Sequence, residues 1–431
     1  MPTRSRNTQF SLTRRDALWA GLAVAALPAF AGCQNSSATF SRPSDKQDHF
    51  IRTRMAALKV PGVAVAKIED GTVAWERGFG VGNVETGELI TERTLFQAAS
   101  LSKPIFAYVV MQAVDQGVIG LDDRLIDYAQ PRGKSDHPWL SEVTVRDALQ
   151  HTTGLPNWRP MEEDLALTPS YKPGTASSYS GEAFHWVQLA IENITRKGLD
   201  TLMREYLFAP ARLNDMSMLW EASRDQREVY GHTTDERGSV VLSDIQFARE
   251  QGLRLNEVAE RWGRPMRLWT VSDQLRALSQ MRPHTHERAR HRPPWRWTHP
   301  NYLQINSPAT LRCAAGDYAR FACLMMPGRN QSAWELSEAT RQFMLTPQFE
   351  RPDVQGGVLP RGIGWGLERR DDGIAYYHWG SNSNTHISVI VADTSDRSGL
   401  VVMTNAGAGR QLIKDVVLEL TGKNYIGVST S

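Results

Sequence analysis

The sequence has 431 residues, of which 41% are hydrophobic and 22% are charged, enough apolar material for a substantial folded core. Its formal net charge is +2, but the first 33 residues hold four arginines and one aspartate, so 45 basic and 46 acidic residues remain beyond them. This near-neutral balance excludes the strongly basic composition from which nucleic-acid binding is inferred, and we expect no nucleic-acid partner.

Residues 1–33 are typical of an export signal. Two adjacent arginines precede an apolar run over 18–31, which is too short to span a bilayer comfortably. The arginine pair resembles a twin-arginine signal, and the small residues before Cys33 resemble a lipobox. We therefore expect a periplasmic or membrane-anchored lipoprotein, lipidated at Cys33, with residues 34–46 as a tether. The alternative is an ordinary signal that is cleaved after small residues and leaves Cys33 uninvolved.

A helix and a β-hairpin are predicted next. Residues 49–58 have helical spacing of their apolar side chains. Residues 61–68 and 72–80 read as two strands, because they are rich in small and β-branched residues and flank an acidic, glycine-containing turn at 69–71. The folded domain is therefore expected to begin with one helix and one hairpin.

A buried helix with a serine and a lysine at its start follows the hairpin. Residues 105–111 are apolar on nearly every side, Pro104 is tolerated in a first turn, and Gly117 is a plausible end. Ser100 lies at the mouth of this helix, and Lys103 shares its face. Burial would disfavour the protonated amine, lower its pKa and let it act as a base for Ser100. The alternative is that Ser100 caps the helix and Lys103 extends to water.

Two further segments carry local signals. Thr144 is expected to cap a short helix that Gly154 terminates. A turn-rich loop over 172–182 leads into an amphipathic helix near 183–195, and the loop exposes Tyr179. A lone tyrosine in a loop usually serves packing, so Tyr179 alone does not indicate chemistry.

The stretch from about 235 to 304 is an atypical insertion, rich in Arg, His and Trp. It is consistent with a metal site on His284, His286 and His291, an anion-binding surface, a substrate lid, or a solvated insertion folded over the main body. A metal is the least expected of these, because no acid or thiol cluster with ligand spacing accompanies the histidines. We expect no metal and no cofactor.

The C-terminal part is predicted to be rich in strands. A helix begins within 307–321, four strands follow, and a helix over about 410–420 closes the fold; the predicted strands are 362–368, 374–378, 386–392 and 399–404. We predict an α/β protein of the α+β type, with one antiparallel sheet built from both chain ends. The folded domain would cover 47–425, with a mainly helical subdomain over about 120–345. Cys313 and Cys323 are expected to be two buried thiols.

Three short motifs occur in a fixed order along this chain: Ser100-x-x-Lys103, Tyr179-x-Gly181 and His378-x-Gly380-Ser381. In this order they resemble the penicillin-recognising serine hydrolases, the group of class C β-lactamases, D,D-carboxypeptidases and related esterases. Segments 151–155, 308–321 and 403–405 resemble further parts of that family. The resemblance covers about residues 48–232 and 305–421.

The resemblance implies a role for each motif. Ser100 would be the nucleophile that forms an acyl-enzyme, and Lys103 would hold a shared proton and activate it. Tyr179 would relay the proton to the leaving group. The backbone N–H groups of Ser100 and Ser381 would hold the oxyanion. His378 would replace the family's strand lysine and orient a substrate carboxylate or tune the tyrosine.

Other positions implied by the resemblance are structural. Gly380 belongs to the strand that borders the substrate, whereas His151 and Asp317 would hold loops in place. Two positions depart from the family pattern: Gly181 stands where Asn is usual, and Trp379, expected at or near the sheet edge, follows His378 where the family has Lys-Thr-Gly. Both departures favour ester or peptide substrates over efficient β-lactam hydrolysis.

The sequence supports three functions. The first is an exported serine hydrolase that acts on small esters, short amides or peptides. The second is a β-lactamase or D-alanyl-D-alanine carboxypeptidase acting on cell-wall-type substrates. The third is a non-catalytic binding module tethered to the membrane through Cys33. The retention of Ser100, Lys103 and Tyr179 favours an enzyme over the binding module.

Overall fold

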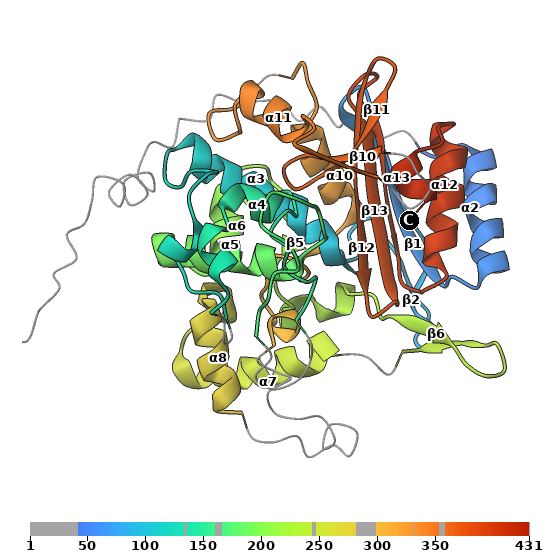
Figure 1. Ribbon diagram of the computed structural model, residues 1–431. Coiled ribbons are helices and arrows are strands. Elements are labelled where there is room, and N and C mark those ends of the chain that lie inside the picture. The colour runs from blue at the N-terminus through green and yellow to red at the C-terminus, as the bar shows by residue number, and fades with distance from the viewer. Residues whose placement is uncertain are drawn as a thin grey trace, which may run out of the picture.

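The computed structural model describes residues 42–132, 136–159, 166–243, 247–281, 299–329, 331–352 and 358–430. The predicted export signal with Cys33, and the histidines at 284, 286 and 291, lie outside these ranges. In the described ranges the chain forms a large sheet with helices on both faces, and a mainly helical region lies beside it (Figure 1). This architecture confirms the predicted fold class.

The main sheet is antiparallel throughout and combines both ends of the chain. Its order over the described residues is β3-β2-β1-β14-β13-β12-β11-β10-β9. The strands are β1 (Gly62–Glu69), β2 (Thr72–Asn83), β3 (Glu88–Leu89), β9 (Phe349–Pro352), β10 (Val358–Arg361), β11 (Gly366–Arg370), β12 (Gly373–Asn382), β13 (His386–Asp393) and β14 (Ser398–Thr404). The join between the chain ends is the β1–β14 pair, in which Val65 lies opposite Val402.

The six predicted strands are all present, and the differences are local. β3 and β9 are short strands at the two sheet edges, and β10 is a short strand next to β9. Strands this short contain too few alternating side chains for a sequence period to be read. β12 runs on to Asn382, so the segment 378–382 lies within a strand rather than between two strands. This difference matters because it places the third motif on a rigid element.

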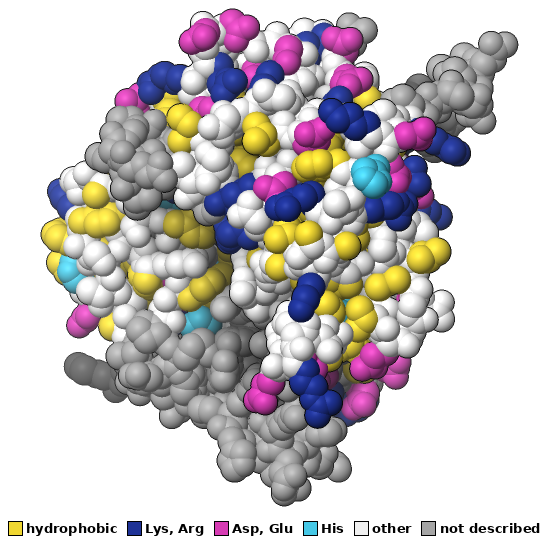
Figure 2. All heavy atoms as spheres, turned by 90° about the vertical axis from the view of Figure 1, so that its right-hand side faces the viewer, with side chains coloured by type: hydrophobic (Ala, Val, Ile, Leu, Met, Phe, Trp, Pro, Cys, Tyr) yellow, Lys and Arg dark blue, Asp and Glu magenta, His cyan; other side chains and the backbone are white. Residues whose placement is uncertain are grey.

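Helices on the outer face of the sheet come from the two chain ends. These are α2 (Asp45–Leu58), α12 (Gly409–Thr421) and α13 (Ile426–Ser429). α2 begins earlier than predicted, since Ser44 and Gln47 form a capping box at its start. An ion pair between Arg54 and Asp415 joins α2 to α12. Figure 2 shows this face, where acidic and basic side chains are interspersed among small apolar areas.

The inner face of the sheet packs on α3 (Ser102–Asp115) and α10 (Ala315–Leu324), which belong to the larger of two apolar clusters. The smaller cluster fills the outer face. β13 is buried along its whole length, as expected for a strand that is covered on both faces. Neighbouring side chains of β12 therefore belong to opposite faces, which decides where each side chain of the third motif points.

The remaining elements form the helical region and its connections. Helices are α4 (Val145–Leu149), α5 (Gly181–Thr195), α6 (Leu199–Met203), α7 (Phe247–Trp262), α8 (Val271–Ser279) and α11 (Glu338–Met344). Short strands are β4 (Phe96–Gln97), β5 (Met216–Ser217), β6 (His232–Thr234), β7 (Val240–Leu242) and β8 (Arg312–Cys313). Thr144 caps α4 as predicted, but the helix ends at Leu149, well before Gly154, because His151 takes a left-handed backbone with φ of 65°.

The prediction for the two cysteines can be compared with these ranges. Cys313 and Cys323 are both buried and unpaired with each other, as predicted. Burial raises the pKa of the Cys313 thiol well above its usual value, which keeps it protonated. In the part of the chain that the structure describes, no helix is long and apolar enough to cross a membrane.

Candidate active site

The predicted serine and lysine meet at the start of α3. Ser100 lies in a 3₁₀ turn, Ala99–Leu101, directly before the helix, and α3 is buried from Ser102 to Ala113. Lys103 Nζ lies 3.2 Å from Ser100 Oγ and 3.0 Å from the Pro308 carbonyl oxygen. The lysine therefore points inward, and the alternative in which it extends to water does not occur.

Burial determines the charge of Lys103. Lys103 is almost completely buried, with 1% of its surface exposed. The loss of hydration lowers the pKa of its amine well below the usual value of a lysine, and the nearby Arg361 makes a smaller contribution. No carboxylate of the described residues contributes to that shift. A neutral amine at hydrogen-bond distance from a serine hydroxyl can accept its proton.

The turn that carries Ser100 is held by hydrogen bonds from distant segments. The Tyr318 hydroxyl donates to the Leu101 carbonyl at 2.8 Å, and the Ala98 N–H donates to the Leu311 carbonyl at 2.9 Å. Ala99 has φ of 51°, a left-handed conformation that a residue with a side chain rarely adopts. Such strain persists where surrounding contacts determine the backbone, as they do here beside the candidate nucleophile.

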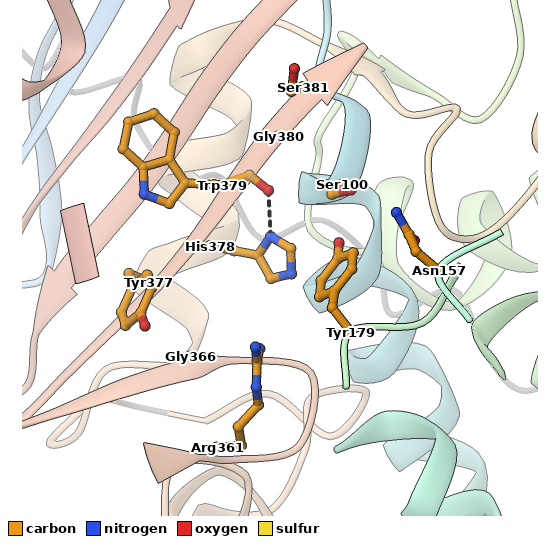
Figure 3. Close-up of a pocket in the computed structure, with 10 residues that line it drawn as sticks. All are labelled: Ser100, Asn157, Tyr179, Arg361, Gly366, Tyr377, His378, Trp379, Gly380 and Ser381. Atoms are coloured by element: carbon orange, nitrogen blue, oxygen red, sulfur yellow. Dashed lines mark hydrogen bonds between the residues drawn. The ribbon is translucent and has the colours of Figure 1, made fainter. Parts of the chain in front are cut away.

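Tyr179 faces Ser100 and Lys103 from the loop before α5. Its ring centre lies 4.5 Å from Lys103 Nζ, and Figure 3 shows its hydroxyl directed toward Ser100. Burial raises the pKa of this phenol, and the neighbouring Ser100 hydroxyl opposes the rise. His151 positions the loop: its ring lies 4.4 Å from the Tyr179 ring, and its Nδ1 accepts a hydrogen bond from the Ser180 N–H at 3.0 Å.

His378 on β12 faces the same space and is neutral. Its Nδ1 donates to the Trp379 carbonyl at 2.7 Å, drawn as the dashed line in Figure 3, so Nε2 carries no proton in the neutral ring. Burial, with a smaller effect of the Arg361 guanidinium, lowers the pKa of His378 to about 3. The imidazole is therefore uncharged near neutral pH and can accept a hydrogen bond but not pair with a carboxylate.

Gly380 and Trp379 lie on opposite faces of the sheet. A Cβ atom at Gly380 would lie 2.3 Å from the Ala98 carbonyl oxygen, so only glycine lets β12 approach the turn that carries Ser100. Trp379 points to the outer face, where its Nε1–H donates to the Gly427 carbonyl at 2.9 Å. The sequence analysis expected Trp379 at or near the sheet edge, and Trp379 does border one. Among the described residues, β11 pairs with β12 only up to Tyr377, whereas residues 378–382 pair with β13.

One cavity of 330 Å³ joins these groups. It is lined by Ser100, Asn157, Tyr179, Arg361, Gly366, Tyr377, His378, Trp379, Gly380 and Ser381, and Lys103 lies beneath it. The structure thus brings together all six site residues that the sequence analysis selected. Among the described residues that line the cavity, Arg361 is the one with a charged side chain.

The sequence analysis missed Arg361 and Asn157. Arg361 ends the short strand β10, and its guanidinium lies 6.0 Å from the Tyr179 ring centre. Asn157 follows the 151–155 segment on a loop without regular structure. No periodic pattern marks either residue; the one available signal was a lone polar side chain in a segment rich in glycine and proline. Only the folded structure shows that both residues line the cavity.

The departure at Gly181 has a steric cause. A Cβ atom there would lie 2.8 Å from the Trp158 ring and 2.9 Å from the Asn157 carbonyl oxygen. The Gly181 N–H donates to that carbonyl at 2.8 Å and to Asn157 Oδ1 at 3.1 Å. The loop at 157–158 therefore occupies the space that a larger residue at 181 would need.

Two curated proteins match this chain over part of its sequence. A penicillin-binding protein 4 from Amycolatopsis lactamdurans is 28% identical over 186 residues, which are 40% of this chain and 49% of that protein. A D-aminopeptidase from Brucella anthropi is 26% identical over 189 residues, which are 39% of this chain and 35% of that protein. The match thus spans half or less of the length of these curated relatives.

Structural similarity extends further along the chain than sequence similarity. A penicillin-binding protein homologue from Pyrococcus abyssi superposes with a TM-score of 0.63 at 20% identity, over 88% of this chain and 77% of that one. At this identity the likeness shows a shared fold. The family model described as Beta-lactamase matches residues 48–419, which run from α2 into α12 and include every motif of the cavity. The chain therefore belongs to the β-lactamase family.

Proposed function

We propose that this protein is a serine hydrolase that works through an acyl-enzyme on small esters, short amides or peptides. The observation that carries the proposal is the 3.2 Å contact between Ser100 Oγ and the Lys103 amine, whose charge is suppressed by burial. A protonated lysine could not accept the serine proton, whereas the neutral amine can. A purely structural role does not explain why Lys103 is buried beside Ser100, because burying an amine costs stability.

The proposed reaction has two halves. Ser100 Oγ attacks the substrate carbonyl as its proton passes to Lys103, and backbone N–H groups of Ser100 and Ser381 receive the oxyanion. The bond to the leaving group then breaks, and Tyr179 relays the proton to the departing oxygen or nitrogen. Water attacks the resulting ester in the second half, which releases the acid and restores the serine hydroxyl.

Arg361 supports a more specific substrate class. It brings a positive charge to the cavity wall, close to Tyr179, while His378 is neutral. We propose that Arg361, rather than His378, pairs with a carboxylate of the substrate. Peptides with a free C-terminus and β-lactams both carry such a carboxylate, which keeps a D-peptidase or β-lactamase as the second candidate function.

The test is covalent labelling with a matched variant. Wild type treated with a fluorophosphonate should gain one adduct on Ser100, seen by intact mass and peptide mapping, and should hydrolyse 4-nitrophenyl esters. Ser100→Ala should lose the label and lower kcat/KM by about 10⁴-fold, whereas Ser141→Ala, an exposed serine of the helical region, should behave as wild type. Turnover that survives in Ser100→Ala would refute the proposal, and a lack of label and turnover in wild type would favour the binding module.

Export and lipidation are separate proposals on residues outside the described ranges. We propose that the arginine pair directs export and that Cys33 becomes the lipidated first residue. Cells fed labelled palmitate should incorporate label into wild type and not into Cys33→Ala. Equal incorporation into both proteins, or none into either, would contradict the lipid attachment at Cys33.

A further inference from the structure

The 235–304 insertion contacts the segment that leads to Pro308. Its helices α7 and α8 lie below α5 in the view of Figure 1. Residues 303–309 are buried but belong to no helix or strand, so their backbone N–H and carbonyl groups need partners from other segments. Glutamine side chains on three helices hold this segment. On α7, Gln251 Oε1 accepts a hydrogen bond from Gln304 Nε2 at 2.7 Å.

The other two glutamines bind the backbone of the segment directly. On α8, Gln274 Nε2 donates to the Ile305 carbonyl and Gln274 Oε1 accepts from the Ile305 N–H, both at 3.0 Å. On α5, Gln188 Nε2 donates to the same carbonyl at 3.3 Å, and Gln188 Oε1 accepts from the Ser307 N–H at 2.8 Å. Both glutamines are 1% exposed. Because a buried amide or peptide group without a partner is costly, these bonds fix the segment in one position.

Pro308, at the end of this segment, is a partner of the candidate base. Its carbonyl oxygen lies 3.0 Å from Lys103 Nζ. A neutral amine has two N–H bonds and one lone pair, so an N–H that donates to this carbonyl restricts rotation about the Cε–Nζ bond. The lone pair can then face Ser100 Oγ at 3.2 Å. A shift of the Pro308 carbonyl would change how well the amine is aimed at the serine.

We infer that Gln274 is a positioning residue for the reaction. By fixing Ile305 it places the Pro308 carbonyl, and this carbonyl orients the Lys103 amine for proton transfer. The inference rests on the proposed function. Gln274 is not among the described residues that line the cavity, so it acts on the rate of acylation and not on substrate binding. In α8 the insertion thus supports the candidate base, a role that differs from that of a substrate lid.

The experiment measures binding and acylation separately. Gln274→Met keeps the length of the side chain and removes both bonds to Ile305. Stopped-flow acylation by 4-nitrophenyl acetate gives the dissociation constant of the ester and the rate constant of acylation. We expect acylation in Gln274→Met to be about tenfold slower with an unchanged dissociation constant, because the amine is less well aimed while the cavity wall is intact.

Gln112→Met is the matched control. Gln112 is 4% exposed, and its Nε2 donates to the carbonyls of Tyr206 and Trp334 at 3.0 and 2.7 Å. This variant should lose stability in urea unfolding as Gln274→Met does, yet be acylated at the wild-type rate. An unchanged acylation rate in Gln274→Met, an equal loss in both variants, or a loss confined to the dissociation constant would overturn the inference.

A second measurement needs no turnover. The free energies of unfolding of wild type, Gln274→Met, Lys103→Met and the double variant form a double-mutant cycle. We expect the two effects to be non-additive, because Pro308 links the two side chains; additive effects would overturn the inference. If the ester does not acylate wild type, the proposed function fails, whereas this cycle still decides the role of Gln274.

Discussion

The charge of Lys103 is the residue-scale feature on which the chemistry depends. An amine that is neutral in the folded protein regains its proton on unfolding at any pH between its lowered pKa and the usual value near 10.5. The unfolded state then binds more protons, so folding stability rises with pH across that window and the lysine ceases to oppose folding above it. The lowered pKa lets the Lys103 amine act as a base. The same burial that lowers it reduces the stability of the folded protein.

This linkage can be measured with Lys103→Met, which has a similar length and no charge. Between pH 7 and pH 9 the free energy of unfolding of wild type should rise relative to the variant, by up to about 1.4 kcal/mol per pH unit, the effect of one proton. Urea unfolding at the two pH values gives the difference. Parallel pH dependences of wild type and variant would show that Lys103 is charged in the folded state. The variant should also lose turnover.

His378 gives a second prediction at this scale. Because its pKa is lowered to about 3, it does not titrate between pH 5 and pH 8. The acid limb of the kcat/KM profile should come from protonation of Lys103, with activity rising as pH increases through the lysine's lowered pKa. His378→Asn should therefore change the rate without moving that limb. A limb near pH 6.5 that disappears in the variant would contradict the neutral state of His378.

Arg361 predicts how the cavity recognises charge. In Arg361→Gln, KM for a substrate with a free carboxylate should rise about tenfold relative to its methyl ester, because the cation that pairs with the carboxylate is gone. Steady-state kinetics on the two substrates measure the change. Arg369→Gln, which removes an exposed arginine of β11, is the matched control and should leave both KM values as they are. Equal effects of the two substitutions would contradict the assignment.

At the scale of elements, the decisive contact is the approach of β12 to the turn before α3. Gly380→Ala should lower both the melting temperature and kcat, because the added Cβ meets the Ala98 backbone, which cannot move without shifting Ser100. Thermal unfolding and ester kinetics provide the two measurements. Gly82→Ala on β2 is the control, since its Cβ would have ordinary contacts of 3.5 Å and more. A fully active Gly380→Ala variant would show that this packing is not required.

At the scale of the whole molecule, the sheet depends on both chain ends. β1 lies between β2 and β14, so loss of the N-terminal hairpin would expose one edge of β14. A chain that begins at Val84 retains all six site residues yet should give no cooperative unfolding and no fluorophosphonate label. A chain that begins at Arg42 should give both. Labelling of the shorter chain would show that the helical region carries the site by itself.

Most helices and strands of this protein, and its candidate catalytic residues, could be predicted from the amino-acid sequence. The hairpin, the buried helix and the late strands follow from local period and turn residues, and Ser100, Lys103 and Tyr179 follow from motif order. Only the tertiary structure decided the charges of Lys103 and His378, the direction of Trp379 and the places of Arg361 and Asn157. These depend on burial and on contacts between segments far apart in the chain, such as Asn157 with Gly181 or Gly380 with Ala98. Local periodicity carries no information about such contacts, because they form only when β12, α3 and α5 pack around one cavity.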